Sequence, residues 1–376
     1  MKELYILDSS YNATSAGTNR LLAFALALQK RGIKVTIFYL FPYYNREKCE
    51  RYTNVLNYVY LWENSPTSNK YFNTIRSMRI FYKLMKPEIP VYVYSLLNCL
   101  YYLRKKKNIR LYHEYTENPE IVGKISGILG NYLYKLYKKT IPQLDGLFLI
   151  TPSLCDLYIS KFGANPSSTL LLNMIVDTKR FEDINQVCIT KTISYCGIIS
   201  EYKDGVSILI KAFEKVVRKY PEYVLKLIGP FKDSNTKREL LDLVENLSLQ
   251  NNVIFTGSVP PQEMPILLKS SKILALARPD NIQAKYGFAT KIGEYLMTER
   301  PIVLTRVGAV ENYLKDKENC IFATPNDIND FADKLLWTIE NNDIAMHIGK
   351  KGKEVALKYF NAEIESDKIY NLIYNN

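Results

Sequence analysis

Short apolar runs alternate with amphipathic stretches along the first half of the chain. Residues 19–31 place apolar side chains on one wide face, and Gly32 follows where a glycine readily closes a helix. A strand, a loop, this helix and a second strand predict a parallel sheet with a right-handed crossover. The strands expected in this half cover residues 2–7, 33–40, 55–61, 109–115, 144–151 and 169–175.

The same alternation starts again in the second half. Strands are expected over residues 192–199, 224–228, 252–257, 272–277, 301–305 and 320–323. Helices are expected over residues 205–219, 233–246, 261–269, 290–300 and 328–341. Strands and helices that alternate in two series predict the α/β class, with two Rossmann-like, doubly wound parallel-sheet domains facing a cleft.

A polar stretch at residues 177–186 marks the expected junction between the two domains. We predict a first domain over residues 1–177 and a second over residues 178–358, and 376 residues are enough for both. Residues 359–376 are expected to form a C-terminal helix that crosses back to the first domain.

No strand is predicted between residues 69 and 107, where aromatic and aliphatic side chains are interleaved with lysine and arginine. This region ends in four successive cations at residues 104–107, and residues 124–140 have a similar character. Such segments either lie on an anionic membrane surface or form core helices with a solvated basic end.

The chain carries a formal net charge of +12, and the whole excess lies in its first half. Residues 1–175 contain 23 lysines and arginines against 11 acidic residues, whereas the remaining residues contain 27 of each. This asymmetry favours a first domain that faces an anionic partner, such as a phospholipid, a lipid diphosphate or nucleic acid. A basic surface that only aids solubility explains the count equally well.

Several classes of protein are disfavoured by the composition. No apolar run approaches the roughly 18 residues of a membrane-spanning helix, and the N-terminus reads as a buried strand rather than a signal peptide. The six cysteines are scattered without a C-x-x-C pair, which predicts reduced thiols, a cytosolic location and no zinc site. Neither an Asp-x-Asp sequence in a suitable place nor a histidine cluster is present, so no metal or cofactor is expected.

Loops that follow strands carry the candidate chemistry, because ligands of doubly wound sheets bind at the carboxyl ends of the strands. The first loop ends at Gly17 before a helix, where backbone N–H groups favour phosphate, but it lacks a G-x-G-x-x-G fingerprint. In the second domain, Lys203 precedes a helix and can neutralise a diphosphate leaving group. An ordinary loop and a solvated lysine are the alternatives.

The sequence YGFATKIGE at residues 286–294 joins a turn of small residues to a short helix. Thr290 is expected to cap this helix, and Glu294 can accept hydrogen bonds from a sugar diol such as ribose. The alternative is an amphipathic helix whose glutamate is merely exposed. The donor-binding residues predicted here are Tyr286, Gly287, Phe288, Ala289, Thr290, Lys291 and Glu294.

His113 is one of two histidines in the chain and lies towards the end of a predicted strand, in the sequence RLYHEYTENPE. At that position it can exchange a proton with a substrate, bind a hydroxyl group of a donor, or serve only as a structural residue. His113 and Lys203 are the catalytic residues predicted from the sequence.

In their order and spacing these elements resemble the retaining glycosyltransferases of family 4, which have the GT-B fold, from end to end of the chain. The resemblance rests on SAGTNRLLAFALALQKRGIKV, LLNMIVDTKRF, YCGIISEYKDGVSILIKAF, KLIGP, VIFTGSVPPQEMPILLKSSKILALARP and above all GFATKIGEYLMTERPIVLTRVGAV. It implies that Lys203 binds the donor diphosphate and that Glu294, as the second acid of the E-x7-E motif, binds the ribose. It further implies that the backbone of residues 287–290 contacts the donor, and that Gly17 and His113 lie near the transferred sugar.

Two positions depart from the family pattern. Tyr286 occupies the place of the first glutamate of E-x7-E, which usually touches the donor sugar. Ile198 stands where an arginine often follows the glycine matched by Gly197, which removes one cation from the diphosphate site. We interpret the tyrosine as a subfamily trait.

The resemblance implies transfer of a sugar, with retention, from a nucleotide-sugar donor to a hydroxyl of a glycan or lipid-diphosphate-linked acceptor. The expected setting is the assembly of bacterial capsule, O-antigen or exopolysaccharide, in the cytoplasm or peripherally on the inner face of the plasma membrane. An anionic membrane surface is an expected partner and nucleic acid is not. The alternatives are a UDP-sugar 2-epimerase-like enzyme, a catalytically inactive GT-B scaffold and a non-enzymatic basic nucleic-acid-binding protein.

Overall fold

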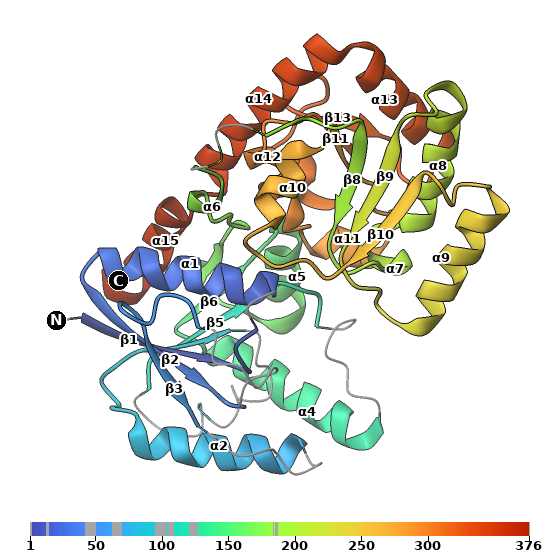
Figure 1. Ribbon diagram of the computed structural model, residues 1–376. Helices are drawn as coiled ribbons and strands as arrows, with labels where there is room; N and C mark the ends of the chain where they lie inside the picture. Colours follow the sequence, from blue (N-terminus) through green and yellow to red (C-terminus); the bar gives the residue numbers. More distant parts are fainter. Residues whose placement is uncertain are drawn as a thin grey trace. The chain divides into compact units, whose positions relative to one another are not determined.

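The computed structural model describes residues 2–12, 15–41, 50–61, 70–94, 103, 109–119, 127–182, 184 and 187–375, with side chains except at 70–72 and 127–129. The chain divides into two compact units. Unit 1 comprises Met1–Ile175 and Ala362–Asn376, and unit 2 comprises Val176–Asn361. Each unit is an α/β structure built on a parallel sheet (Figure 1).

The sheet of unit 1 has, within the described residues, the strand order β3-β2-β1-β4-β5-β6-β7, with every neighbouring pair parallel. Strands β4, β5 and β6 are buried along their whole length, because helices cover both faces of the sheet. All strands run the same way, so their carboxyl ends share one edge. The strands are β1 (Lys2–Asp8), β2 (Ile33–Tyr39), β3 (Asn57–Tyr60), β4 (Val91–Tyr94), β5 (Leu111–Tyr115), β6 (Gly146–Leu149) and β7 (Thr169–Leu171).

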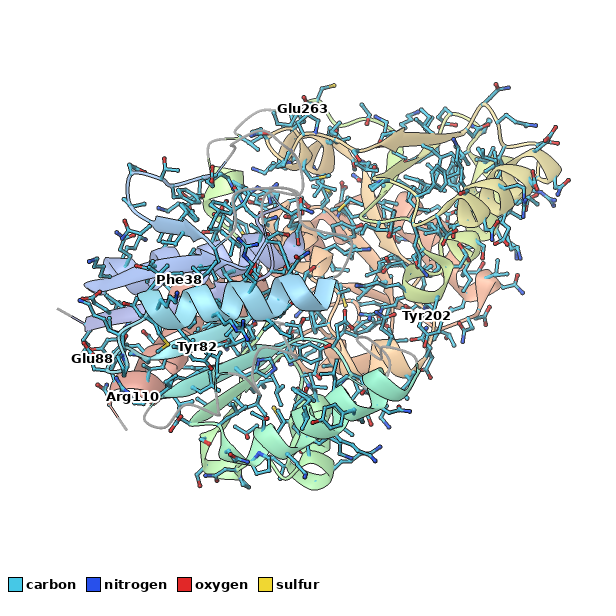
Figure 2. All side chains as sticks on the ribbon, turned by 90° about the horizontal axis from the view of Figure 1, so that it is seen from below. Phe38, Tyr82, Glu88, Arg110, Tyr202 and Glu263 are labelled. Atoms are coloured by element: carbon cyan, nitrogen blue, oxygen red, sulfur yellow. The ribbon has the colours of Figure 1, made fainter. Side chains whose placement is uncertain are left out.

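Two groups of helices cover the two faces of this sheet. On one face, α1 (Ala16–Lys30) and α15 (Ala362–Tyr374) share a core with Leu4, Ile6 and Tyr92 of the sheet. On the other face lie α2 (Lys70–Leu84), α4 (Gly127–Thr140) and α5 (Pro152–Phe162), with 3₁₀ turns at Ile141–Gln143 and Pro166–Ser168. There Phe81 of α2 meets the ring of Phe38 edge-on, with centroids 5.0 Å apart, in the region that Figure 2 labels at Phe38 and Tyr82.

The prediction of an irregular region without a strand between residues 69 and 107 is wrong. The structure forms α2 there, followed by the central strand β4, whose four residues VYVY are all buried. Four residues are too few to show a periodicity, and the basic, aromatic residues around them hide the strand. Residues 69, 95–102 and 104–107 of this region lie outside the described residues, as do residues 124–126 of the second basic segment.

The sheet of unit 2 has, within the described residues, the order β10-β9-β8-β11-β12-β13, and it is parallel throughout. Its strands are β8 (Thr192–Cys196), β9 (Val224–Ile228), β10 (Val253–Gly257), β11 (Ile273–Leu276), β12 (Ile302–Thr305) and β13 (Ile321–Ala323). Every strand expected from the second half of the sequence is therefore present.

The helices of unit 2 follow the predicted pattern and add several short ones. In α8, for example, the buried apolar residues recur at the spacing of one helix face, and they pack into the core. The helices are α6 (Lys179–Glu182), α7 (Glu201–Asp204), α8 (Val206–Lys219), α9 (Ser234–Asn246), α10 (Met264–Ser270), α11 (Ile282–Tyr286), α12 (Lys291–Met297), α13 (Ile328–Glu340) and α14 (Asn342–Tyr359), with a 3₁₀ turn at Gly308–Asn312.

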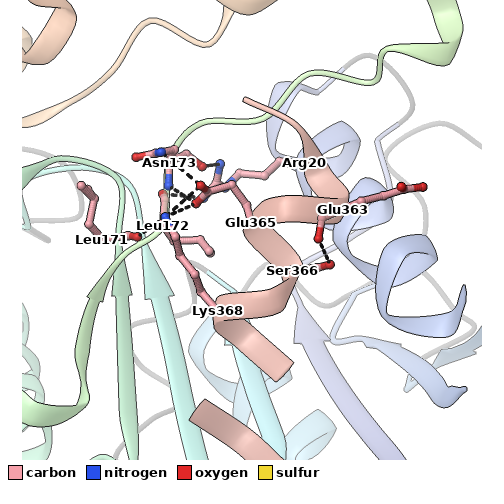
Figure 3. Close-up of polar contacts among 8 residues, drawn as sticks. All are labelled: Arg20, Leu171, Leu172, Asn173, Glu363, Glu365, Ser366 and Lys368. Atoms are coloured by element: carbon pink, nitrogen blue, oxygen red, sulfur yellow. Dashed lines mark hydrogen bonds and ion pairs between the residues drawn. The ribbon is translucent and has the colours of Figure 1, made fainter. Parts of the chain in front are cut away.

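A buried polar network fastens the C-terminal helix α15 within unit 1 (Figure 3). The carboxylate of Glu365 accepts hydrogen bonds from the backbone N–H and the side-chain amide of Asn173, at 2.8 and 3.1 Å. Arg20 of α1 donates to the carbonyl oxygens of Asn173 and Leu172, at 2.6 and 3.0 Å. Lys368 completes the group by pairing with Glu365 and donating to the carbonyl of Leu171.

The same arginine also pairs with Glu114 of β5, and both side chains are almost fully buried. Arg20 thus joins α1, β5 and the segment that follows β7. A buried charge is costly unless it is paired, so the loss of one member leaves its partners unsatisfied.

We expect Arg20→Met to lower the free energy of unfolding by roughly 3–5 kcal/mol, because it strands Glu114 and two carbonyl groups in the core. The matched control is Arg31→Met, since Arg31, the residue that caps the C-terminus of α1, pairs with Asp367 of α15 but both side chains are exposed. That change should cost less than about 1 kcal/mol. Urea unfolding followed by circular dichroism measures both, and equal losses would contradict the importance of the buried network.

Candidate active site

In unit 2, the loop that leads into α7 and the helix α12 meet at the carboxyl end of β8. The N–H of Cys196, the last residue of β8, donates to the hydroxyl of Tyr295 on α12 over 2.8 Å. Lys203 lies on α7, and Lys291 and Glu294 lie on α12. Since ligands of doubly wound sheets bind at the carboxyl ends of strands, this junction is the candidate site.

Lys291 forms a buried ion pair at this junction. Its Nζ lies 2.8 Å from Asp204 Oδ2 and 2.9 Å from the hydroxyl oxygen of Tyr195, and 4.2 Å from the centroid of the tyrosine ring. Burial lowers the pKa of Lys291, and the carboxylate of Asp204 offsets this in part. Burial raises the pKa of Asp204, but the charge of Lys291 and the hydrogen bonds from Lys291 and Tyr195 together outweigh it and leave that pKa below the ordinary value. Asp204 is therefore ionised at neutral pH.

Two glycines allow the chain to pass close to this ion pair. Gly197 has a φ of +134°, and a Cβ added to it would lie 2.8 Å from the Nζ of Lys291. Gly229 has a φ of +135°, and its added Cβ would lie 2.1 Å from the carbonyl oxygen of Gly197. Only glycine fits this backbone conformation and this spacing.

Lys203 lies beside the buried pair. Its backbone N–H donates to the Oγ of Ser200, which caps α7, over 3.4 Å. Its positive charge adds to the lowering of the pKa of Lys291, and the next residue in the chain, Asp204, is the partner of Lys291. The residue before Lys203, Tyr202, is exposed (Figure 2), and so is Ile198, which occupies the position of the expected arginine.

Glu294 lies in the first turn of α12 and is paired with an arginine. Its Oε1 accepts a hydrogen bond from Nη1 of Arg180 over 2.5 Å. Burial, reinforced by the charge of Glu294 and opposed by that of Lys291, raises the pKa of the nearby Cys196 thiol to about 12. The end of β8 therefore has Lys291 and Glu294 together beside it.

The turn before α12 is largely buried. Tyr286 ends α11 and is half-buried, whereas Gly287, Phe288 and Ala289 are buried. The ring of Phe288 packs against that of Phe360, with centroids 5.5 Å apart. The side chain of Phe288 thus belongs to the core of unit 2, and the contact of this turn with a donor stays a prediction.

The prediction that the side chain of Thr290 caps α12 is wrong. Thr290 has helical backbone angles, with a φ of −58° and a ψ of −27°, and its side chain makes no capping hydrogen bond. A capping side chain needs an extended backbone at that residue, and the helical conformation turns the hydroxyl away.

Gly17 lies in the first turn of α1 in unit 1. The helix begins at Ala16, and the Oγ of Ser15 accepts the N–H of Gly17 over 3.2 Å. This N–H group is therefore already used within the protein. A Cβ at Gly17 would lie 3.1 Å from the hydroxyl oxygen of Tyr94, so the glycine allows close packing against the end of β4.

His113 lies within β5, as the predicted strand implied, and it is fully buried. Its Nδ1 bonds to the carbonyl oxygen of Val93 over 3.0 Å, and its Nε2 has no hydrogen-bond partner among the described residues. Burial lowers its pKa to about 4, although the bond to Val93 opposes the shift. His113 is therefore neutral at pH 7, and its assignment as a catalytic residue stays a prediction.

Asp8 is a buried carboxyl group at the carboxyl end of β1 that the sequence did not single out. Its Oδ1 accepts the N–H of Ser9 over 2.7 Å. Burial raises its pKa to about 7, and the hydrogen bonds from Ser9 only partly oppose the rise. Asp8 is thus the last residue of a central strand and titrates near neutral pH.

Sequence reasoning also missed Asp204, Tyr195 and Arg180 as partners of the candidate site residues. Asp204 is adjacent to Lys203, but an acid at a helix end is common on protein surfaces. Arg180 lies within LLNMIVDTKRF, a segment noted only for its place at the junction. The signal available for Arg180 was its position as a charged residue shortly after the apolar run LLNMIV.

Within the described ranges, no group of three or more histidine, cysteine or acidic residues is placed to hold a metal ion. In the same ranges, no helix is both long and apolar enough to span a membrane. A cavity of about 300 Å³ opens at the amino-terminal edge of the unit 1 sheet, where Figure 2 labels Glu88 and Arg110. Its lining mixes acidic and basic side chains, and it includes none of the predicted site residues.

Comparison with known proteins bears on the region that contains the candidate site. Residues 189–355 match the family model described as "Glycosyl transferases group 1". An uncharacterized glycosyltransferase of Methanocaldococcus jannaschii is 27% identical over 277 residues, which cover 68% of this chain and 72% of that protein. Both findings support a glycosyltransferase.

Solved structures show the same fold over the whole length of the chain. Sucrose-phosphate synthase from Thermosynechococcus elongatus superimposes with a TM-score of 0.80 at 15% identity, covering 100% of this chain and 99% of the other. HepE of Anabaena, solved in complex with UDP and glucose, gives a TM-score of 0.76 at 16% identity and covers 100% of both chains. The chain has the GT-B fold. The fold class expected from the sequence, two parallel-sheet α/β domains, is confirmed.

We expect Asp8→Asn to change how stability depends on pH. In the folded protein Asp8 keeps its proton up to about pH 7, whereas the unfolded chain loses it near the ordinary pKa of 3.8. The protonated carboxyl therefore contributes fully below about pH 4, and the contribution is lost as pH rises towards 7. Each unit of difference between the folded and unfolded pKa corresponds to roughly 1.4 kcal/mol. Between pH 4 and pH 8 the free energy of unfolding of Asp8→Asn should therefore rise by up to about 4 kcal/mol relative to that of wild type.

Unfolding free energies of wild type and Asp8→Asn at pH 4, 6 and 8 measure this gain. The control is Asp156→Asn, which removes a carboxylate from α5 in the same unit. This change should leave the pH dependence of the unfolding free energy as it is in wild type. A difference between wild type and Asp8→Asn that is constant over this range would contradict a raised pKa for Asp8.

Proposed function

We propose that this protein is a retaining glycosyltransferase that moves a sugar from a nucleotide-diphosphate donor to a hydroxyl group of a glycan or lipid-linked acceptor. The observation that carries the proposal is the meeting of Lys203, the Lys291–Asp204 pair and Glu294 at the end of β8. The charge of Lys203, the Lys291 ammonium held by Asp204, and the carboxylate of Glu294 match the chemistry of a nucleoside diphosphate. The match of residues 189–355 to a glycosyltransferase family supports the same conclusion.

The lysines act on the leaving group. When the bond between the anomeric carbon and the diphosphate oxygen breaks, negative charge develops on the diphosphate, and fixed ammonium groups stabilise it. The acceptor oxygen forms its bond on the same face of the sugar, and its proton passes to the leaving phosphate oxygen. Positioning of the two substrates and stabilisation of this charge supply the rate enhancement.

Lys291 replaces the missing cation at residue 198. Ile198 is exposed and carries no charge, whereas the ammonium of Lys291 lies directly beneath the glycine loop at Gly197. The donor diphosphate binds over this loop, with Lys203 on one side. The carboxylate of Glu294 receives the ribose hydroxyls, and the backbone of residues 287–290 lies along the donor. Charge neutralisation by lysines requires no metal ion.

The acceptor is a glycan or a lipid-diphosphate-linked oligosaccharide of a bacterial capsule, O-antigen or exopolysaccharide. The basic first half of the chain supports an anionic acceptor or surface. In unit 1, α4 carries Lys135 and Lys139 as exposed side chains together with the exposed ring of Tyr132. A helix of this kind binds an anionic membrane surface from the cytoplasmic side.

We expect Lys203→Ala and Glu294→Ala to weaken donor binding while the fold survives. Loss of a charged hydrogen bond of about 1.5–3 kcal/mol lowers affinity roughly tenfold to a hundredfold. A thermal-shift panel of UDP-, GDP-, ADP- and CDP-sugars identifies the donor, since a tight ligand raises the melting temperature by mass action. Calorimetry with that donor then measures each variant.

Lys350→Ala is the matched control, because Lys350 is an exposed lysine on α14 of the same unit and should bind the donor like wild type. Transfer or hydrolysis of a radiolabelled form of the donor shows that the bound molecule reacts. Full activity in both site variants would overturn the assignment of this site.

We expect binding to vesicles of phosphatidylglycerol and phosphatidylcholine to fall when Lys135 and Lys139 are both changed to glutamine. Each basic residue near an anionic surface contributes about 1 kcal/mol, so the partition coefficient should drop by roughly tenfold or more at low salt. The control is the double change Lys350→Gln and Lys351→Gln on α14, which removes the same charge from the near-neutral half. Vesicle co-sedimentation measures both, and equal losses would contradict a membrane-binding role for α4.

A further inference from the structure

Arg180 and Glu294 form an ion pair between two short helices of unit 2. Nη1 of Arg180, on α6, lies 2.5 Å from Oε1 of Glu294, on α12. Nη2 of the same arginine donates to the carbonyl oxygen of Pro261 over 2.8 Å. The side chains are 15% and 23% exposed, so the pair is largely shielded from water. One guanidinium therefore holds both the carboxylate and the loop before α10.

The helix that presents Arg180 is itself fixed. Phe181, the next residue, is buried, and the Nζ of Lys269 donates to the carbonyl oxygens of Phe181 and Ile184 at 2.9 and 2.8 Å. The position of the guanidinium thus depends on contacts that reach α10 and not on the short helix α6 alone.

The geometry divides the work of the Glu294 carboxylate between its two oxygens. Oε1 is occupied by Arg180, and this contact restrains the rotation of the glutamate side chain. The planar guanidinium has a rigid set of donors, and its bond to Pro261 prevents it from following the carboxylate if the latter moves. Arg180 thus fixes the direction of Oε2 through its bond to Oε1. A ligand can bind to Oε2 without displacing Arg180.

We propose that Arg180 is a positioning residue for donor recognition: it holds Glu294 so that the second carboxylate oxygen accepts hydrogen bonds from the ribose hydroxyls of the donor. This inference rests on the proposed role of Glu294 in ribose binding. Arg180 does not touch the donor in this account. Loss of Arg180 should therefore weaken the discrimination between ribose and deoxyribose, and it should not change the binding of the diphosphate.

The test compares UDP, GDP, ADP and CDP with their 2′-deoxy counterparts by calorimetry. Wild type should bind at least one of these ribonucleotides tenfold or more tightly than its deoxy form. Glu294→Gln should abolish most of that preference, and Arg180→Gln should reduce it to within threefold of the Glu294→Gln value. Arg180→Lys keeps the positive charge but loses the planar pair of N–H donors, so it should retain an intermediate preference for the ribonucleotide.

A double variant and a control separate positioning from simple stabilisation. Arg180→Gln combined with Glu294→Gln should discriminate no worse than Glu294→Gln alone, because both changes remove one coupled contact. Arg218→Gln breaks an arginine–glutamate pair of the same length on the exposed face of α8, and it should leave the preference unchanged. Thermal unfolding of every variant confirms that the compared proteins are folded. If Arg180→Gln is unfolded, Arg180→Lys decides the question.

The possible failures are distinguishable. If no ribonucleotide binds, or if Glu294→Gln keeps the wild-type preference, the proposed ribose site is wrong and the inference falls with it. If Glu294→Gln loses the preference but the folded Arg180 variants keep it, Glu294 is the ribose ligand and only the role of Arg180 is overturned. A uniform loss of affinity for both sugars in the Arg180 variants identifies a structural ion pair and also overturns the inference.

Discussion

The burial of one ammonium group beneath a glycine loop is the constraint on which the candidate site depends. Lys291 lies at the start of α12 with little exposure, and a lysine in such a place needs a counter-charge. Asp204 supplies it, and the hydroxyl and ring of Tyr195 complete the surroundings. Residue 197 must then be a glycine, because a side chain would occupy the space of the ammonium. One charge thus fixes the identity of several neighbours.

Counter-charges also accompany other enclosed charged groups among the described residues. Glu294 meets Arg180, and in unit 1 Arg20 meets Glu114 while Glu365 meets Lys368. Such pairs add little net stability compared with apolar side chains of the same size, but they fix geometry, since only one arrangement satisfies every group. In unit 2 this geometry sets the direction of the lysine and the carboxylate before any ligand arrives. In unit 1 it fastens α15 to the segment after β7.

Periodic features of the sequence predicted the fold well, and single-residue features predicted it less well. All six strands of unit 2 were expected, because each is an apolar run between turn residues that a helix separates from the next. Strand β4 was missed because its four residues lie within a basic and aromatic region. Thr290 was expected to cap α12 from its residue type, but the backbone there is already helical. His113 was expected towards the end of a strand that reaches residue 115, and β5 does end at Tyr115, but His113 is fully buried within it.

The sequence by itself determined the α/β class, the two series of strands, and the segments after strands on which Lys203, Lys291 and Glu294 lie. These features depend on local periodicity and on residues that follow one another in the chain. Only the tertiary structure decided the partners of those residues. Asp204 lies 87 positions from Lys291, and Arg180 lies 114 positions from Glu294. No local pattern records such a pairing, because it arises when parallel strands bring the loops at their carboxyl ends to one edge of a sheet.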